Sequence, residues 1–413
     1  MRQISNFLLL KDLLVLTKDG EWGKSEPTSD SIEMYIIRGT DFAAVRYGNL
    51  SNVPIRYISE KIAERKSLQP NDILIETAGG TKEQPTGRTV FLKPRIFEKA
   101  SLPITCASFS RFLRVNPQLA VPEYIYWYLQ FLYQTGKMEQ HQIQHTGVAR
   151  FQYTRFAQSV NIPLPSHSTQ QRIVDILSTY DNLIDNNNRR IALLEESIHQ
   201  LYKEWFVRSR FPGYESVKVV DGIPEGWNRK RLKDIALSIR QSIHPSNTEP
   251  NTPYVGLEHI PRQSMALTSW GYSHEVDSNK FVFTKGDILF GKIRPYFHKV
   301  VFAPVNGICS SDAIVIRPIN QDLFGLTLSL VSSVAFVDYT SKTSKEGSKM
   351  PRANWDVMEQ YPILIPNPKL LQEFNNLVSL VTYQITSLIF TNQRLRQARD
   401  LLLPRLMNGS IAV

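Results

Sequence analysis

The two halves of the chain end in the same arrangement, an apolar segment bracketed by prolines and followed by a long run with heptad spacing. The segments are residues 161–165 (NIPLP) and 361–366 (YPILIP), and the heptad runs continue to about Val207 and Asn408. An offset of 201 residues (374 − 173) aligns the apolar positions, among them Ile173 with Phe374, Ile184 with Ile385 and Leu201 with Leu402. Because a repeat sets the architecture in which local motifs lie, we expect a molecule with two similar ends.

The repeat extends upstream, with an offset that falls along the chain. Three short blocks recur in the same order, followed by a cysteine and an arginine: residues 10–13 with 232–235, 35–37 with 254–256, 72–75 with 287–290, Cys106 with Cys309, and Arg114 with Arg317. The offset decreases from 222 (232 − 10) to 203 (309 − 106), so the first unit carries about 20 additional residues. Extra length collects in loops, which often carry recognition.

Composition is that of an ordinary globular protein, with 42% hydrophobic and 21% charged residues in a chain of 413. No apolar run reaches the roughly 18 residues of a membrane span, and Lys11 and Asp12 interrupt the apolar start, so we expect a cytoplasmic protein.

The matching cysteines Cys106 and Cys309 suit small buried positions. His141 and His145 stand four apart without a third ligand nearby, so no metal site is predicted.

The formal charge of +10 is concentrated outside the heptad runs. Subtracting acidic from basic residues gives 19 − 15 = +4 for residues 1–150, 7 − 6 = +1 for 151–211, 15 − 12 = +3 for 212–345 and 7 − 5 = +2 for 346–413. A basic surplus favours a polyanionic partner such as nucleic acid, since neutralised phosphates release counterions. Many basic proteins bind no nucleic acid, so charge alone leaves this open.

Both heptad runs predict long helices, at about 168–207 and about 368–408. Their apolar positions step by three and four residues, the spacing of a coiled-coil seam. Ser168 with Gln171 fits a capping box, and Asn367 before Pro368 fits an N-cap followed by proline at the first helical position. Helices of about 35 to 40 residues are roughly 50 to 60 Å long.

Each seam contains one asparagine close to its middle, Asn187 in the first and Asn392 in the second. If the helices lie side by side and antiparallel, the two asparagines face each other and set the register of the pair. The alternative is that each asparagine occupies a solvated part of its seam.

Several segments resemble one family, the specificity subunits of type I restriction-modification systems. They are QQRIVDIL at 170–177, IALLEESIHQL at 191–201, IPEGW at 223–227 with LKDI at 232–235, and LLLPRL at 401–406 with Gly409. The resemblance rests on the combination and order of these segments and covers essentially the whole chain. One departure is that the first unit lacks the Pro-Glu-Gly-Trp opening found at 224–227.

The resemblance implies an α+β protein with two mixed target-recognition domains separated by two long antiparallel coiled-coil helices, related by a pseudo-twofold internal repeat. The expected domains are 1–150 and 212–350, and the expected conserved regions, each with a long spacer helix, are 151–211 and 351–413. Each domain would recognise one half of a split, asymmetric site in double-stranded DNA.

The resemblance also implies partner proteins in a prokaryotic cytoplasm. Two modification subunits would bind S-adenosylmethionine and methylate adenine, and restriction subunits would use ATP with magnesium for translocation and cleavage. The chain itself is expected to be non-catalytic and to hold no cofactor. It contains no Asn-Pro-Pro-Tyr or Asp-Pro-Pro-Tyr motif and no glycine-rich cofactor turn. Asp72, Glu76 and Asp312 lack the pattern of nuclease ligands and are interpreted as structural carboxylates.

The candidate DNA contacts are polar side chains that can reach base edges or phosphates. In the first unit they lie in the glycine-rich stretch 79–88 and just before the proline-bracketed segment: Thr81, Lys82, Gln84, Thr86, Arg88, Gln144, Thr146, Arg150 and Arg155. In the second they lie after a predicted strand and again before the proline-bracketed segment: Lys292, Arg294, Tyr296, His298, Lys299, Lys342, Lys345, Lys349 and Arg352. An ordinary flexible loop and a half-buried strand remain alternatives for 79–88 and 292–299.

The leading hypothesis is therefore a DNA-binding specificity subunit that determines where partner enzymes act. Two alternatives stay open at this point. One is a nuclease or methyltransferase that acts alone, and the other is a coiled-coil scaffold without sequence-specific DNA binding.

Overall fold

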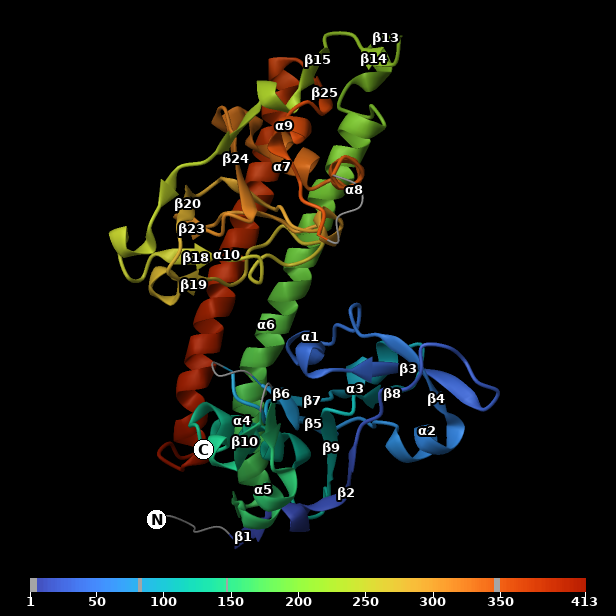
Figure 1. The fold of residues 1–413 in the computed structure, drawn as a ribbon, viewed down its shortest axis with the longest axis vertical. Coiled ribbons are helices and arrows are strands. Elements are labelled where there is room, and N and C mark those ends of the chain that lie inside the picture. The colour runs from blue at the N-terminus through green and yellow to red at the C-terminus, as the bar shows by residue number, and fades with distance from the viewer. Residues whose placement is uncertain (1–5, 81–83, 146–147, 345–349) are drawn as a thin grey trace. The chain divides into compact units, whose positions relative to one another are not determined.

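The protein is described by a computed structural model that covers residues 6–80, 84–145, 148–344 and 350–413 (Figure 1). It divides into two compact units. Unit 1 comprises residues 1–185 with 395–413, and unit 2 comprises 186–394. Each long helix contributes a part to both units, so each unit is described with the helical parts that belong to it.

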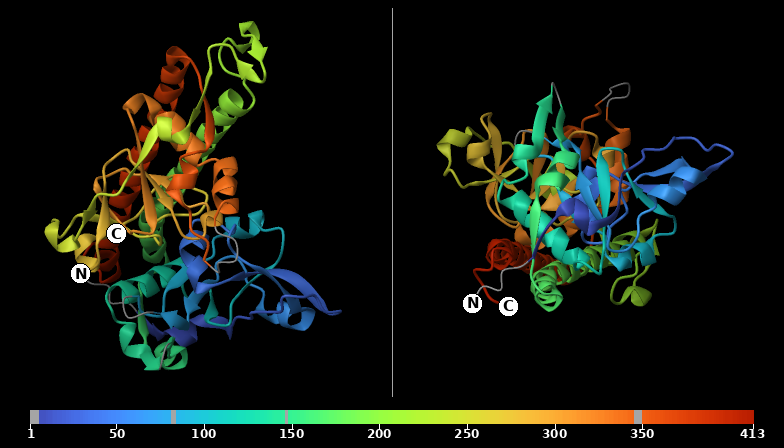
Figure 2. Two further views of the ribbon diagram at one scale, coloured as in Figure 1. Left: turned by 45° about the horizontal axis from the view of Figure 1, so that its top comes forward. Right: turned by 90° about the horizontal axis from the view of Figure 1, so that it is seen from below.

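Unit 1 is a mixed α+β fold. Its strands form a four-stranded antiparallel sheet in the order β2-β9-β5-β7, a three-stranded sheet β4-β3-β8, a three-stranded sheet β10-β11-β6 and the pair β1-β12. Strands β10 and β11 pair antiparallel, and Figure 2 gives two further views of the ribbon. The strand bounds are β1 Asn6–Leu9, β2 Leu14–Asp19, β3 Ser31–Ile37, β4 Ile55–Ser59, β5 Ile73–Glu76, β6 Ala78–Gly80, β7 Thr89–Phe91, β8 Ile104–Cys106, β9 Ser110–Val115, β10 Gln142–His145, β11 Val148–Phe151 and β12 Asn161–Leu164. The helices are α1 Phe42–Val45, α2 Glu60–Lys66, α3 Pro94–Lys99, α4 Pro122–Gln134 and α5 Tyr153–Ser159.

Unit 2 repeats this plan. Its sheets have the orders β16-β24-β21-β22, β17-β20-β23-β18-β19 and β15-β25, and β13 pairs with β14. The strands are β13 Val219–Val220, β14 Ile223–Pro224, β15 Asn228–Arg231, β16 Ala236–Ile239, β17 Ser242–Ile243, β18 Pro253–Val255, β19 Gly271–Tyr272, β20 Lys280–Phe283, β21 Ile288–Gly291, β22 Val300–Phe302, β23 Gly307–Cys309, β24 Ala313–Pro318 and β25 Pro362–Ile365. The helices are α7 Phe324–Val331, α8 Val334–Lys342 and α9 Trp355–Met358.

The predicted internal repeat is confirmed at the level of strand pairing. The order β2-β9-β5-β7 corresponds to β16-β24-β21-β22, and a pair of parallel strands recurs, β3 with β8 in unit 1 and β18 with β23 in unit 2. A buried carboxylate is bound by both nitrogens of an arginine fork in each unit. Arg114 donates to Asp72 at 2.8 and 2.8 Å, and Arg317 donates to Asp287 at 2.7 and 2.7 Å.

The two long helices are α6, His167–Tyr202, which continues into a π-helical turn over Lys203–Val207, and α10, Pro368–Met407. The predicted ranges agree with these bounds to within a residue or so. Asn367 accepts a hydrogen bond from the Leu370 amide at 3.0 Å, which confirms the predicted N-cap.

The capping box predicted for the start of α6 is wrong. The helix begins at His167, two residues before the start that a cap at Ser168 would give (169 − 167 = 2), and the hydroxyl of Ser166 accepts from the Thr169 amide at 3.3 Å. Gln171 instead donates to Asp175 at 2.8 Å.

Within each unit the parts of α6 and α10 run antiparallel. In unit 2, Trp205 contacts Phe374 with ring centroids 5.5 Å apart, and Asn187 donates to Asn392 at 2.9 Å, so the numbering rises along one helix as it falls along the other. In unit 1, Leu177 of α6 shares a buried cluster with Leu403 and Leu406 of α10. The two asparagines expected to face each other therefore do so, and both are buried.

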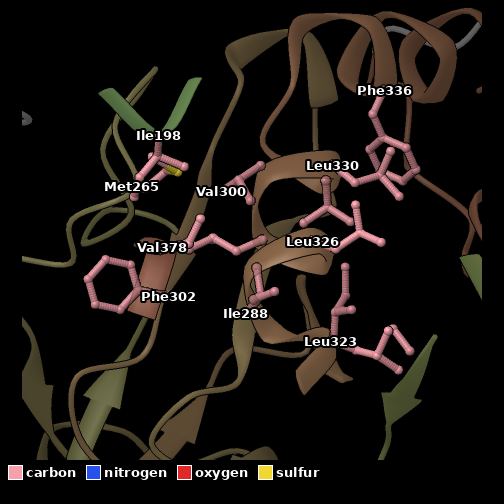
Figure 3. Packing of buried hydrophobic residues seen from close by; sticks show 14 of the residues in the cluster. Ile198, Met265, Ile288, Val300, Phe302, Leu323, Leu326, Leu330, Phe336 and Val378 are labelled. Atoms are coloured by element: carbon pink, nitrogen blue, oxygen red, sulfur yellow. The ribbon is translucent and has the colours of Figure 1, made fainter. Parts of the chain in front are cut away.

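The main apolar core of unit 2 joins the sheet, α7 and both long helices. Figure 3 shows Leu326 and Leu330 of α7 near Ile288 and Val300 of the sheet, with Ile198 of α6 and Val378 of α10 in the same cluster. Burial of such side chains contributes about 1.5 to 3 kcal/mol each. Among the described residues no single helix is long and apolar enough to cross a membrane; only the pair Gln321–Val331 and Val334–Lys342, bent by 66°, reaches that length when counted together.

Candidate nucleic-acid interface

The two groups of candidate residues in unit 1 meet on the sheet β10-β11-β6. Strand β6 begins the glycine-rich stretch, and β11 lies in the later segment, with Arg150 opposite Ala78. The exposed candidates here are Gln84, Arg150 and Arg155. Segments separated by some 70 positions in sequence (150 − 78 = 72) thus lie on adjacent strands of one sheet.

Thr86 and Arg88 form hydrogen bonds that hold the glycine-rich stretch 79–88 against the rest of unit 1. Thr86 is fully buried, and its amide and hydroxyl donate to Gln142 at 2.9 and 3.0 Å. Arg88 donates to both oxygens of buried Glu76, at 2.9 and 2.6 Å, and these hydrogen bonds raise the pKa of Arg88. The guanidinium fork of Arg88 is already occupied within unit 1, and the Thr86 side chain has no exposed surface.

Some candidates cannot be placed. Thr81, Lys82, Thr146, Lys345 and Lys349 lie outside the described residues, as does the side chain of Gln144. Their predicted contacts with DNA stay predictions.

In unit 2 the two groups of candidates also meet. Ile293 and Arg352 form an antiparallel bridge, and the Arg294 amide donates to the Pro351 carbonyl at 2.8 Å. Arg352 remains 58% exposed and donates to Asp312 at 3.2 Å. Lys342 is exposed at the end of α8.

The loop from 292 to 299 has an unusual backbone conformation. Arg294 and His298 both adopt the left-handed conformation, with φ of 51° and 52°, on either side of the short helix Pro295–Phe297. Such strain in residues other than glycine persists only where the surroundings enforce it. The His298 ring contacts the Ser332 carbonyl at 2.8 Å, and Tyr296 is 55% exposed at the tip.

The two lysines of this loop are partly withdrawn from solvent. Lys292 donates to the Ser311 carbonyl at 2.8 Å, and Lys299 donates to the Leu257 carbonyl. Burial lowers the pKa of both ammonium groups. Lys292 also lines a cleft of about 630 Å³ together with Arg240, Arg352 and Trp355. Three cations around one cleft suit an anionic ligand.

The same pattern of backbone hydrogen bonds joins three chain segments beneath each surface, and we call it the three-segment frame. In unit 1 the Thr77 amide donates to the Phe109 carbonyl at 2.8 Å, and the Phe151 amide donates to the Thr77 carbonyl at 2.8 Å. In unit 2 Lys292 donates to Asp312 at 2.7 Å and Ala353 donates to Lys292 at 2.8 Å, again between backbone atoms. An arginine precedes the third residue of each frame, Arg150 before Phe151 and Arg352 before Ala353.

Sequence analysis missed three residues beside these surfaces: Phe109, Arg240 and Arg262. Phe109 is 64% exposed in the turn between β8 and β9. The guanidinium of Arg262 lies 3.7 Å from the centre of the Phe297 ring. The signal for Phe109 was the repeat itself, since the offset of 203 that pairs Cys106 with Cys309 also pairs Phe109 with Asp312.

The acidic residues considered as nuclease ligands are bound to arginines. Asp72 pairs with Arg114, Glu76 with Arg88, and Asp312 with Arg352. In the part of the chain that the structure describes, no three histidine, cysteine, aspartate or glutamate side chains are grouped so as to hold a metal ion. Cys106 and Cys309 are buried as predicted, and burial raises the pKa of each thiol to about 12.

The repeated domains, their exposed cations and the paired helices define the class of protein. A sequence model of the type I restriction modification DNA specificity domain matches residues 8–196 and again 224–374. These matches include well over half of the chain, and the chain belongs to this family.

Individual relatives agree with this assignment. The chain is 26% identical over 311 residues to the type I restriction enzyme MjaIX specificity subunit of Methanocaldococcus jannaschii, which covers 69% of each protein. It is 24% identical over 297 residues to the EcoDI specificity subunit of Escherichia coli, covering 64% of this chain and 63% of that one. The fold resembles the crystal structure of a type I S subunit from M. genitalium, with a TM-score of 0.51, 14% identity and coverage of 98% and 97%.

Proposed function

We propose that this chain selects the DNA sites at which a type I restriction-modification complex acts, and that each repeat recognises one half of a bipartite, asymmetric site. The observation that carries the proposal is the three-segment frame. It occurs once in each unit, with an exposed arginine beside it, and the family match covers both occurrences.

The asymmetry of the site follows from the side chains. The frames have the same backbone hydrogen bonds but present Thr77, Phe109 and Arg150 in one unit and Lys292, Asp312 and Arg352 in the other. Donor, acceptor and apolar groups discriminate between base pairs in the major groove. Two different sets therefore select different base sequences.

Catalysis belongs to partner subunits in this proposal. Two modification subunits carry S-adenosylmethionine and methylate an adenine in each half-site, and restriction subunits carry ATP and magnesium. This chain contributes DNA recognition and a docking surface, works in the prokaryotic cytoplasm where the DNA is, and catalyses nothing alone. The arginine-bound state of Asp72, Glu76 and Asp312 supports a non-catalytic role, because their carboxylates are engaged in ion pairs.

The proposal is tested by mapping methylated adenines genome-wide in cells that carry this chain with its modification partner. Residues 1–144 are then exchanged for those of a relative, and in a matched control residues 212–344 are exchanged. We expect each exchange to change only one half of the methylated motif, and a different half in each case. A motif that changes in both halves, or in neither, would contradict the assignment of one half-site to each repeat.

The two rival functions predict other results. A methyltransferase that acts alone would transfer methyl groups from S-adenosylmethionine to DNA with this chain as the only protein. A scaffold without DNA recognition would give no discrimination among DNA sequences in a mobility-shift assay that includes the modification partner.

A further inference from the structure

We propose that residues 109 and 312, which occupy the same place in the two three-segment frames, are base-reading positions. Phe109 recognises the methyl group of a thymine in one half-site, and Asp312 accepts a hydrogen bond from the amino group of a cytosine in the other. This inference rests on the proposed function and assigns particular residues and base contacts to it.

The backbone at both positions is fixed independently of the side chain. The carbonyl of residue 109 accepts from the Thr77 amide at 2.8 Å, and the carbonyl of residue 312 accepts from the Lys292 amide at 2.7 Å. A side chain on such a turn can vary without loss of the hydrogen bonds that hold the turn. Residues on a rigid support can present their side chains to a ligand at low entropic cost.

Phe109 has an exposure that the fold does not require. With 64% of its surface exposed, it is the most exposed phenylalanine in the described part of the chain. It lies beside β6, because its carbonyl also accepts from the Ala78 amide at 3.4 Å, and Ala78 is opposite Arg150. An exposed aromatic ring can supply apolar contact for a thymine methyl group, and an exposed arginine on the neighbouring strand pair can supply a cation for a phosphate.

Asp312 has a charge that would by itself oppose DNA binding. Arg352 donates to its Oδ1 at 3.2 Å, and the Lys292 ammonium is bound to the neighbouring Ser311 carbonyl at 2.8 Å. These cations compensate the carboxylate locally, so phosphates do not repel this edge of unit 2. The Asp312 side chain is one-third exposed. A paired carboxylate with an accessible oxygen can accept from the exocyclic amine of cytosine, as acidic side chains do in the major groove.

The contrast between the two positions supports specificity as their role. A purely structural position in a repeated frame has no reason to be a large apolar side chain in one copy and a charged one in the other. The turn itself requires neither side chain, because the hydrogen bonds that hold it run between backbone atoms. Contact with different bases accounts for both.

The test uses the full chain with its modification partner and a library of DNA sites that differ by single base pairs in each half. Four variants are compared with wild type: Phe109→Ala, Phe109→Leu, Asp312→Ala and Asp312→Asn. We expect Phe109→Ala to reduce discrimination roughly ten- to a hundred-fold at one A·T pair of one half-site, and Phe109→Leu to retain most of it. Asp312→Ala should relax one C·G pair of the other half-site by a similar factor. Asp312→Asn should shift that position toward adenine, which an amide recognises with two hydrogen bonds.

Matched controls are Phe7→Ala, which removes another exposed phenylalanine of unit 1, and Asp322→Asn, which removes an exposed carboxylate of unit 2. Both should leave every position of the motif unchanged. Thermal midpoints of all variants should stay close to wild type, because the frame uses only backbone atoms.

Two outcomes would overturn the inference. One is unchanged discrimination at every position in Phe109→Ala and Asp312→Ala. The other is an equal loss of affinity for all sequences, which would indicate a phosphate contact or altered packing. Either result is distinguishable from failure of the proposed function, since exchange of residues 1–144 would still change one half of the motif if that function holds.

Discussion

Both units pack apolar side chains against the long helices, but the buried carboxylate at this junction pairs with arginines in unit 1 and with neutral donors in unit 2. Asp181 of α6 accepts from Arg46 at 2.8 and 3.1 Å and from Arg399 of α10 at 2.5 Å. In unit 2, Glu195 of α6 accepts from the Ser264 hydroxyl at 2.7 Å and from the Met265 and Ala266 amides at 2.7 and 2.8 Å. The sheets repeat between the units, but the attachments do not.

The difference teaches that the repeat is preserved where backbone pairing defines the structure. The offset of 201 places Thr382 at the position that corresponds to Asp181, and Arg396 at the position that corresponds to Glu195. Neither Thr382 nor Arg396 carries the carboxylate of its counterpart. Each unit is therefore expected to respond to charge removal and to pH in its own way.

The largest effect is expected at Asp181. Replacement by alanine leaves Arg46 and Arg399 without their shared partner in a buried site. Removing one member of a buried ion pair lowers the free energy of unfolding by about 3 to 5 kcal/mol. The loss should be seen by hydrogen exchange as reduced protection of unit 1 peptides around residues 42–46, with unit 2 peptides around 264–266 unaffected. Asp175→Ala, which removes an exposed carboxylate of the same helix, is the control. Equal loss of protection in both units would contradict the separate attachments.

A smaller effect is expected at Glu195. Alanine at this position leaves one hydroxyl and two amide donors without an acceptor, at a cost of about 1 to 3 kcal/mol. Glutamine keeps the accepting oxygen and should cost less. Hydrogen-exchange protection around residues 264–266 measures the loss in each Glu195 variant. The control is Glu196→Ala, which changes an exposed neighbour. If glutamine is as damaging as alanine, the negative charge rather than the acceptor oxygen holds the loop.

The same two carboxylates give opposite pH dependence. Burial alone would raise the pKa of Asp181, but the charges of Arg46 and Arg399 and their hydrogen bonds outweigh it and lower the pKa below that of a free aspartate. Its contribution to stability is present above the unfolded-state pKa of about 3.9 and is lost as pH falls through the lower folded pKa.

Burial raises the pKa of Glu195, and this effect outweighs that of its hydrogen bonds, which lower the pKa. Its contribution is present below about 4.3 and is lost as pH rises through the raised folded value.

This pH difference is measurable with the variants already described. Exchange protection of unit 1 in wild type should fall on acidification below about pH 4, and Asp181→Ala should lose that dependence. Protection around residues 264–266 should instead decrease as pH rises above about 4.3, and glutamine at position 195 should abolish the decrease. The same direction of change in both regions would argue against the assigned protonation states.

Much of the fold could be predicted from sequence because periodic patterns encode it. The heptad spacing predicted both long helices, and the repeat predicted a molecule with two similar ends. The attachments could not be predicted in this way. Arg399 stands at a heptad step of the second helix, between Leu395 and Leu402. Tyr180 stands at such a step of the first helix, yet its neighbour Asp181 is the more deeply buried residue. A helix with 3.6 residues per turn drifts from a strict heptad, so a seam position can rotate toward a neighbouring domain.

The candidate site was predicted less well, for a related reason. Sequence favours polar residues in loops, but Thr86 and Arg88 are used to hold their loop together. Conversely, Phe109 belongs to a class usually assigned to the core. Which loop residues face solvent depends on pairing between distant segments, such as Arg150 with Ala78, and local composition carries no information about it.

The smallest effect is expected where the two long helices of unit 2 meet through amides. Asn187 donates to Asn392 at 2.9 Å, and Asn392 donates to Asn188 at 2.9 Å. Replacing Asn187 alone with leucine leaves a buried amide partly unsatisfied and should cost about 1 to 2 kcal/mol, whereas replacing both Asn187 and Asn392 should cost about 0 to 1 kcal/mol or even stabilise, because leucine suits the apolar seam. Chemical unfolding of the single and double variants gives the coupling energy between the two positions.

In unit 1 the corresponding cycle of Asp181 with Arg399 should show stronger coupling, since an unpaired buried charge is costlier than an unpaired amide. A coupling of equal size in the two cycles would mean that both contacts act mainly through register, and that the ionic attachment of unit 1 adds little beyond it.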